Sequence, residues 1–179
     1  MEGGITPELI VITDPQKVVE KQLKGYENSK IPLAFLSTAS RWAVESYKGP
    51  KYIFFNKEYN SNIIIETGKT VAVSAIDLAI KSKAAKIIFV GQDLAYLNNK
   101  THAKSYESIY GVKDEIEINR RTEYVIGVSG ERLMTTSSYL IFKDNIEKLI
   151  NKNKNVKFYN CSMGANIIGT KHSKIEELI

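Results

Sequence analysis

Apolar and polar positions alternate along this chain in two different rhythms, one typical of strands and the other of helices. Five short runs are dense in β-branched and aromatic residues and are predicted to be strands. They are LIVIT at 9–13, LAFL at 33–36, YIFF at 52–55, IIFV at 87–90 and VKFY at 156–159. Most of these runs are apolar throughout, and strands that bury both faces are typical of parallel sheets covered on two sides.

The segments between the predicted strands have helical periodicity. At 69–83 the apolar positions recur at i, i+4, i+7 and i+8, and the residues off that stripe are Lys69, Ser74, Asp77 and Lys81. The segment 138–150 repeats this pattern. A helix after Asp14 and a shorter one at 42–47 complete a strand and helix alternation.

This alternation predicts a doubly wound, Rossmann-like α/β fold, with a mostly parallel sheet and helices on both faces. The segment 114–135 departs from it and is predicted to hold an irregular strand and a turn at VSGE, forming a lid or an edge hairpin. A length of 179 residues, 43% of them apolar, provides one sizeable core and is short for two domains. A single domain over 1–179 is therefore expected.

The cysteine content and the length of the apolar runs indicate the cellular compartment of the protein. The single cysteine, Cys161, cannot form an intramolecular disulfide, and the longest apolar runs are far shorter than a membrane span. The opening residues MEGGITPE lack the basic and apolar stretches of a signal peptide. We therefore expect a cytoplasmic protein without a membrane span.

The charge pattern argues against nucleic acid as a partner. The net charge is +5, but the lysines are spread among glutamates and asparagines instead of forming a stripe. The sequence also contains no recognisable basic helix or aromatic platform. A lysine-rich soluble surface is the simpler interpretation, and an anionic small ligand such as a nucleotide is compatible with it.

Polar residues follow the predicted strands directly. In open α/β sheets, ligands bind beyond the carboxyl ends of the strands. The residues at those positions are Asp14, Ser37, Thr38, Asn56, Gln92, Asp93, Asn160 and Ser162. Each residue type also caps helices and forms turns, so capping is the simpler interpretation of any one alone. Together, and with the polar run at 98–102, they predict a site for a polar ligand at one edge of the sheet.

His102, in the polar context NKTHAK, suits a general acid or base, or a phosphate ligand when protonated; an exposed loop histidine is an equal alternative. Spacing predicts no metal site, because paired cysteines and His-x-x-x-His are absent from the sequence. A Mg²⁺ ion held by one carboxylate and a nucleotide phosphate is compatible with the sequence, since it would leave no stronger trace. The GKT at 68–70 lacks the first glycine of a phosphate-binding loop, and helix capping by Thr67 or Thr70 is its simpler interpretation.

Three stretches resemble a known family. They are GITPELIVITDP at 4–15, GKTVAVSAIDLAIKSKAAKIIFVGQDLAYLNNKTHAKSY at 68–106, and VSGERLMTTSSYLIFKDNIE followed by FYNCSMGANIIGT. Together they resemble the central domain of the motility accessory factor (Maf) proteins, a family that also includes the archaeal 6-hydroxymethylpterin diphosphokinase MptE. The resemblance runs nearly end to end, and the GQDLAY and KTHA elements are its most specific part.

The resemblance implies a Rossmann-like domain related to the sialyltransferase-type glycosyltransferases. It implies transfer of a nonulosonic acid from a nucleotide-activated sugar to flagellin or another glycan acceptor, and pyrophosphoryl transfer from ATP with Mg²⁺ to 6-hydroxymethylpterin is the alternative. Carried over by position, the catalytic candidates are Asp93 and His102. The candidates for binding the substrate or nucleotide are Asp14, Gly91, Gln92, Thr101, Gly130, Glu131 and Thr135.

One departure from the family pattern lies at the amino end. Family members usually carry a strand and a glycine-rich turn before the segment that begins here at Gly4. Relative to the family, the chain is therefore expected to lack the amides that hold nucleotide phosphates. A non-catalytic remnant that keeps the fold is accordingly the second hypothesis beside the transferase. The sheet edge left by a missing strand predicts a homo-oligomer.

Overall fold

The computed structural model describes residues 5–57, 64–97, 107, 109, 111 and 123–179. The chain divides into two compact units, Met1–Ala75 and Ile76–Ile179. The predicted α/β class with parallel strands is confirmed, because each unit holds a three-stranded parallel sheet. The sequence predicts one sheet, and the described strands form two parallel sheets and one antiparallel pair. The single domain over 1–179 stays a prediction.

The first unit contains β1 (Ile10–Ile12), β2 (Leu33–Leu36) and β3 (Lys51–Phe54) in the order β1-β2-β3. All three strands lie within one residue of the apolar runs that predict them. They are parallel, and their register pairs Ile12 with Phe35 and Phe35 with Ile53. Their carboxyl ends therefore meet at one edge of this sheet.

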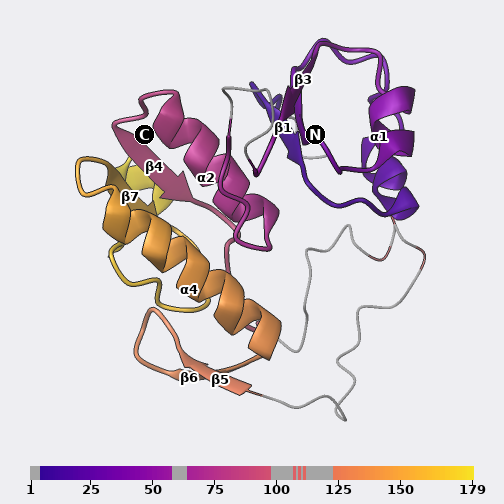
Figure 1. Cartoon of the computed structure of the whole chain (residues 1–179). Coiled ribbons are helices and arrows are strands. Elements are labelled where there is room, and N and C mark those ends of the chain that lie inside the picture. Colours follow the sequence, from indigo (N-terminus) through magenta and orange to yellow (C-terminus); the bar gives the residue numbers. More distant parts are fainter. Residues whose placement is uncertain (1–4, 58–63, 98–106, 108, 110, 112–122) are drawn as a thin grey trace. The chain divides into compact units, whose positions relative to one another are not determined.

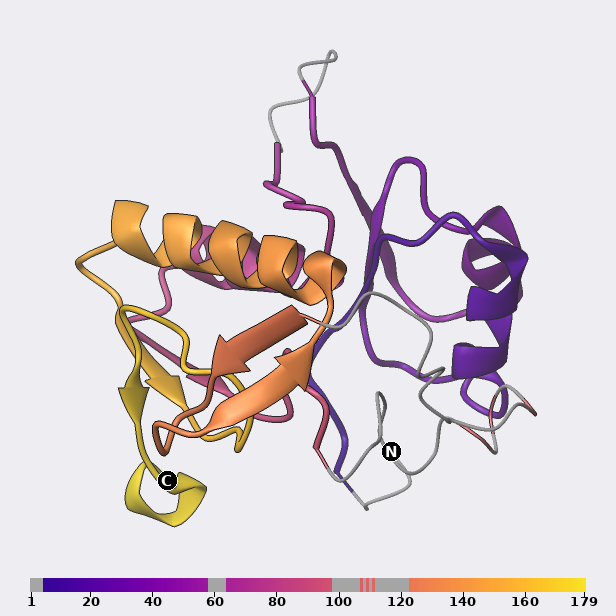
Figure 2. The ribbon, with the colours of Figure 1, turned by 90° about the horizontal axis from the view of Figure 1, so that it is seen from below.

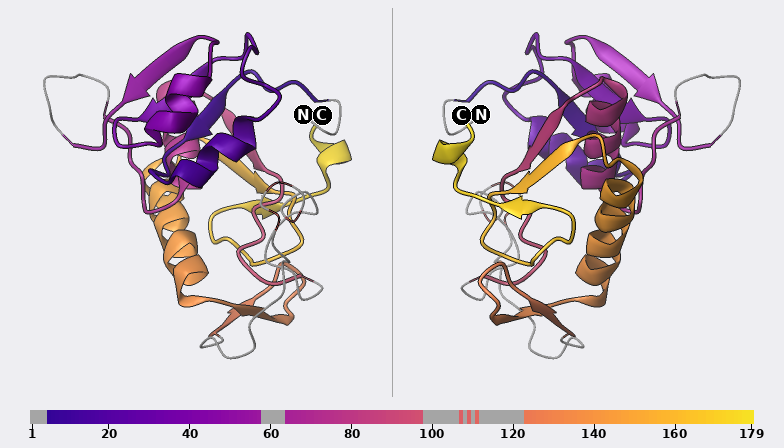
Figure 3. Two further views of the ribbon diagram at one scale, coloured as in Figure 1. Left: turned by 90° about the vertical axis from the view of Figure 1, so that its right-hand side faces the viewer. Right: turned by 90° about the vertical axis from the view of Figure 1, so that its left-hand side faces the viewer.

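Two short helices, η1 (Lys17–Leu23) and α1 (Arg41–Ser46), lie side by side against this sheet (Figures 2 and 3). Together with the strands they bury one apolar cluster, made of Ile12, Val19, Leu23, Leu33, Ala43 and Tyr47. The helix predicted after Asp14 is η1, and it is a 3₁₀ helix. The adjacent β-branched Val18 and Val19 disfavour an α-helix there, and the Gln16 side chain does not cap it.

The helix predicted at 69–83 is α2 (Val71–Lys81). It begins later than expected because Gly68 and Lys69 have left-handed backbones, with φ of 47° and 63°. The sequence pattern places Ser74 and Asp77 off the apolar stripe of this helix, but both residues are buried. The buried Asp77 carboxylate is paired with Lys81, whose Nζ lies 2.5 Å from Oδ2.

The second unit contains β4 (Lys86–Phe89), β7 (Lys157–Asn160) and β8 (Lys171–His172), which are parallel and lie in the order β4-β7-β8. The predicted helix at 138–150 is α4 (Ser137–Lys152), which lies along this sheet (Figures 1 and 2). It buries Ile146, Leu149 and Ile150. A 3₁₀ turn, η2 (Ile175–Glu177), follows β8.

The expected hairpin is confirmed in the described part of 114–135. It consists of β5 (Glu123–Ile126) and β6 (Arg132–Thr135), paired antiparallel; residues 114–122 lie outside the described residues. The other edge of β5 is extended by the chain after β7, since Gly127 forms an antiparallel bridge with Ala165 and Asn166 N donates to Ile126 O at 2.9 Å. The hairpin is thereby attached to the segment between β7 and β8.

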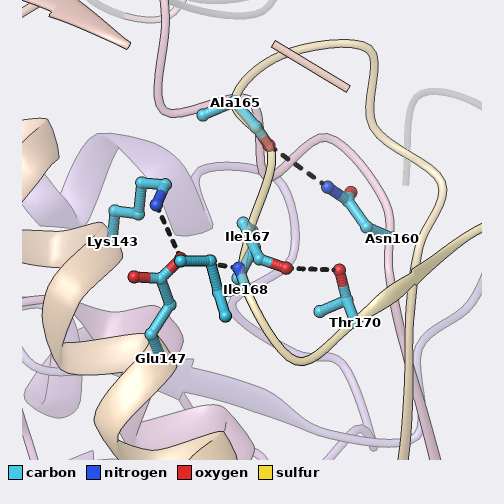
Figure 4. A network of polar contacts seen from close by, with 7 residues as sticks. All are labelled: Lys143, Glu147, Asn160, Ala165, Ile167, Ile168 and Thr170. Carbon is cyan, nitrogen blue, oxygen red and sulfur yellow. Dashed lines mark hydrogen bonds and ion pairs between the residues drawn. The ribbon is translucent and has the colours of Figure 1, made fainter. Parts of the chain in front are cut away.

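The segment between β7 and β8 is held in place by polar contacts (Figure 4). Glu147 Oε1 on α4 accepts hydrogen bonds from Lys143 Nζ and from the Ile168 amide, both at 2.6 Å. Ala165 and Ile167 in this segment are fully buried. Because helix and sheet both fix this segment, the loop that it forms after β7 has a defined position.

Within the described residues, none of the helices combines the length and the apolar character that crossing a membrane requires.

Candidate functional site

Two loops meet where the neighbouring strands β4 and β7 end. We call this edge the β4–β7 rim and define it as residues 90–95 and 161–165. The Gln92 amide donates to Ser162 Oγ at 2.7 Å, and the Ala165 amide donates to the Asp93 carbonyl oxygen at 2.7 Å. The rim therefore lies at the sheet position where ligands of α/β proteins bind.

The carboxyl group of Asp93 is the ionisable group at the rim with a displaced pKa. Burial raises the pKa of Asp93, and the Met163 amide, which donates to the carboxylate, acts in the opposite direction. The side chain is half-buried, whereas Met163 is 60% exposed. A carboxyl group with a raised pKa at the surface edge of a sheet is suited to exchanging a proton with a bound substrate.

Two glycines allow the two loops to approach each other. Gly91 has a φ of +69°, a left-handed conformation that favours glycine, and it turns the chain directly after β4. Gly164 lies against the backbone of Asp93, and a Cβ atom there would be 2.1 Å from the Asp93 carbonyl oxygen. The contact between the loops therefore requires glycine at 164.

Two polar residues expected at this edge serve to position the rim. Asn160 is fully buried, and its Oδ1 accepts the Ser162 amide at 2.9 Å. Its Nδ2 donates to the Ala165 carbonyl at 3.3 Å. Ser162 is also buried and accepts the Gln92 amide through its hydroxyl. These side chains hold the loop backbones, and the side chains of Gln92 and Asp93 are the half-buried polar groups beside them.

The three candidates on the hairpin fall into two groups. Thr135 is fully buried and its hydroxyl donates to the Leu94 carbonyl at 2.7 Å, so it joins β6 to the rim. Gly130 and Glu131 lie exposed in the hairpin turn, where Glu131 Oε2 accepts the Ser129 amide at 3.0 Å. The structure thus brings Thr135 to the rim and places Gly130 and Glu131 in the β5–β6 turn.

The three remaining candidates are Asp14, Thr101 and His102. Asp14 belongs to the first unit, where its Oδ1 accepts the Gln16 amide at 2.7 Å, the local bond of an Asx-turn. Thr101 and His102 lie outside the described residues, so the roles expected for them stay predictions. Over the described ranges, no group of three or more histidine, cysteine, aspartate or glutamate side chains is arranged to hold a metal ion.

Sequence reasoning missed Met163 and Gly164. The candidates predicted from the sequence were the polar residues directly after each strand. After β7 the last of these is Ser162, so the apolar Met163 and the glycine at 164 were not among them. A usable signal was the glycine in NCSMGA, because a glycine shortly after a buried strand often marks a close backbone approach.

Comparison with protein families identifies the group to which the chain is related. Residues 1–99, more than half of the chain, match the model of the family described as 6-hydroxymethylpterin diphosphokinase MptE-like. The chain belongs to this family. The MptE-like match includes β1 to β4 and the part of the rim that holds Gly91, Gln92 and Asp93. A comparison with curated proteins gave no match.

Comparison with solved structures relates this MptE-like chain to a glycosyltransferase fold. It is similar to the structure of the Maf glycosyltransferase from Magnetospirillum magneticum AMB-1, with a TM-score of 0.74 and 14% sequence identity. The match covers 96% of this chain and 27% of that protein, so the MptE-like chain spans about a quarter of its length. The shared feature at this identity is the fold, and the resemblance to Maf and MptE-like proteins seen in the sequence is confirmed.

Proposed function

We propose that this MptE-like chain is a glycosyltransferase-type domain that binds a nucleotide-activated sugar at the β4–β7 rim. The observation that supports the proposal best is the Asp93 carboxyl group, whose pKa burial raises, at the carboxyl edge of a parallel sheet. The likeness to the Maf glycosyltransferase fold over 96% of the chain supports the same class.

The proposed reaction transfers a nonulosonic acid to a hydroxyl group. The bond between the anomeric carbon and the donor phosphate breaks, a bond from that carbon to the acceptor oxygen forms, and the hydroxyl proton must move to a base. Asp93 is the base, or the acid that protonates the departing phosphate, and His102 is the second candidate for the same work. Family resemblance suggests flagellin or another glycan acceptor, in the cytoplasm, with a homo-oligomer as the active form.

The remaining candidates belong to the binding part of the proposal. Gly91 and Gln92 would contact the donor at the rim, beside Asp93. The other proposed contacts are those of Thr101, Gly130, Glu131 and Thr135, and Asp14, which belongs to the first unit, stays a prediction of the sequence. Because the Thr135 hydroxyl already donates to Leu94, it would act by fixing the rim.

The family match favours a second candidate function. Its description names a 6-hydroxymethylpterin diphosphokinase, which suggests transfer of a pyrophosphoryl group to a hydroxymethylpterin. That reaction would use Mg²⁺ to neutralise the phosphate charge, with a carboxylate such as Asp93 or Asp14 among the ligands. The two proposals differ in the ligand that should raise the melting temperature of the chain, a cytidine nucleotide for the first and ATP with Mg²⁺ for the second.

A thermal-shift titration tests the proposed function. The ligands are cytidine monophosphate, ATP and GTP, each with and without Mg²⁺, since a ligand that binds only the native state raises the melting temperature. The glycosyltransferase proposal expects stabilisation by cytidine monophosphate that is lost in Asp93→Ala. The matched control is Asp144→Ala, which removes an exposed carboxylate on α4 and leaves the rim intact.

Two other outcomes contradict the first proposal in different ways. Stabilisation by ATP with Mg²⁺ that is lost in Asp93→Ala, and none by cytidine monophosphate, would favour the pyrophosphokinase. If no nucleotide changes the melting temperature, both transferase proposals fail, and a non-catalytic remnant that keeps the fold is the hypothesis that is left.

A further inference from the structure

Two cationic side chains lie over one indole ring in the first unit. Lys17 Nζ is 5.9 Å and Arg41 Cζ is 4.6 Å from the centroid of the Trp42 ring. Lys17 is the first residue of η1 and follows β1, whereas Arg41 is the first residue of α1 and follows β2. Both cations therefore come from loops at the carboxyl edge of a parallel sheet, which is the edge where α/β proteins bind ligands.

The chain fixes this arrangement through backbone contacts and the core. The Ser40 amide donates to the Asp14 carbonyl oxygen at 2.9 Å, which joins the loop after β2 to the loop after β1. Val19 of η1 and Ala43 of α1 are buried in the same apolar cluster. Because both helices pack on one core, the backbones that carry the two cations have fixed positions beside Trp42.

No acid of the described part of the chain is paired with either cation. Elsewhere in the described chain, lysines on helices pair with carboxylates four residues away, as Lys143 does with Glu147. Lys51 instead donates to carbonyl oxygens at the end of α1. Within the described residues, Lys17 and Arg41 contact no carboxylate, and both are exposed. The two positive charges are therefore available to an anion from solvent.

We propose that Lys17 and Arg41, held on the ring of Trp42, bind the phosphate groups of a ligand. A guanidinium group can donate two parallel hydrogen bonds to one phosphate, and an ammonium group adds a point charge. Contact with the ring restricts both long side chains before the ligand arrives, which lowers the entropy cost of binding. This site goes beyond the transfer proposed at the β4–β7 rim and does not depend on that reaction.

The acid on these loops is Asp14, whose carboxylate accepts the Gln16 amide. A carboxylate beside a phosphate is repulsive unless a cation lies between them. The titrations below are therefore run with and without Mg²⁺. The ligand source is either inorganic pyrophosphate or the phosphates of a nucleotide, because both present the same chemistry to Lys17 and Arg41.

Trp42 provides a direct readout, because it is the only tryptophan in the sequence. The full chain is titrated with sodium pyrophosphate at constant ionic strength while tryptophan fluorescence is recorded, and then with ADP and CDP. We expect a saturable change in emission. Arg41→Gln and Lys17→Gln should each raise the apparent Kd about tenfold, the loss expected for a hydrogen bond to a charged group.

The matched control is Lys30→Gln, which removes an exposed lysine of the same unit and should leave the Kd unchanged. Arg41→Lys keeps the charge and should fall between wild type and Arg41→Gln, which separates lost binding from lost folding. The proposal is overturned if pyrophosphate gives no saturable change, or if Lys30→Gln weakens binding as much as Arg41→Gln. Tighter binding of ADP or CDP than of pyrophosphate would identify a nucleotide as the source.

Failure of the phosphate site at Lys17 and Arg41 can be told apart from failure of the function proposed at the β4–β7 rim. A rim that binds no cytidine nucleotide leaves the pyrophosphate effect on Trp42 unchanged. Conversely, a Trp42 signal that never responds leaves the dependence of nucleotide stabilisation on Asp93 unchanged.

Discussion

The amide of Ala165 donates a hydrogen bond to the carbonyl oxygen of Asp93 at 2.7 Å, and this contact joins the loops that follow β4 and β7. It uses backbone atoms only. The carboxyl group of Asp93 is therefore not needed for this bond and can serve a ligand, and the Met163 backbone partly offsets the rise in its pKa. The β4–β7 rim thus combines a fixed backbone with an ionisable side chain.

Gly164→Ala tests the close contact between these loops. A Cβ atom at 164 would lie 2.1 Å from the Asp93 carbonyl oxygen, so the backbone must shift. We expect a loss of about 1–3 kcal/mol in the free energy of unfolding, as for overpacking in a core. Urea denaturation measures it, with the exposed Ser138→Ala on α4 as control. An unchanged free energy in Gly164→Ala would contradict the geometry.

Thr135→Val tests the attachment of the hairpin to the rim. The substitution keeps the shape of a fully buried side chain and removes the donor to the Leu94 carbonyl. We expect a loss of about 1–3 kcal/mol in the free energy of unfolding, because a buried carbonyl is left unpaired. Thr135→Ser keeps the donor and should lose only about 1 kcal/mol for the missing methyl group. A valine variant as stable as wild type would refute the role assigned to this hydrogen bond.

Asp93→Asn tests the raised pKa through the pH dependence of stability. Above the raised pKa of the native state, Asp93 is charged in both states and the full cost of burying the charge is present. As the pH falls from there toward the unfolded value of about 3.9, the native state takes up the proton first and wild type is stabilised relative to the unfolded chain.

The asparagine variant cannot titrate at this position. We therefore expect Asp93→Asn to be at least as stable as wild type at pH 8, and wild type to gain on it as the pH is lowered toward 4. Thermal unfolding of both proteins across this range measures the difference. The opposite trend, with the variant less stable at pH 8 and the gap closing in acid, would mean that the pKa is lowered.

Tyr47→Phe tests the core of the first unit. Tyr47 is fully buried and its hydroxyl donates to the carbonyl oxygen of Ile31. We expect a loss of about 1–3 kcal/mol in the free energy of unfolding, because the variant leaves that carbonyl unpaired. Trp42 fluorescence reports the unfolding of this unit. Tyr52→Phe, at a side chain that is 61% exposed, is the control and should change stability by less than about 0.5 kcal/mol.

The sequence predicted the strands that carry strong apolar runs and missed the one that does not. The runs at 33–36 and 87–90 are found as β2 and, shifted by one residue, as β4, since buried β-branched and aromatic residues determine them locally. The strand β8 consists of Lys171 and His172, two exposed residues, and has no such pattern. Its position comes from pairing with β7, which is tertiary information.

The candidate site, like the fold, could be predicted only where a local sequence pattern determines it. Gln92 and Asp93 follow an apolar strand, so their place at a sheet edge could be inferred. The partners Met163 and Gly164 are about 70 residues away in the sequence, and only the pairing of β4 with β7 brings them to Asp93. Thr135 was selected as a ligand contact, and its hydroxyl is instead bonded to the Leu94 carbonyl, which no sequence pattern indicates.

Titration with cytidine monophosphate, followed in the amide ¹⁵N–¹H NMR spectrum, tests whether the β4–β7 rim binds the donor nucleotide. We predict that the largest shifts occur at the β4–β7 rim, at Gln92, Met163 and Ala165, and that they disappear in Asp93→Ala. Shifts confined to residues outside 90–95 and 161–165, or a spectrum unchanged by a saturating concentration of the nucleotide, would contradict a donor site at this rim.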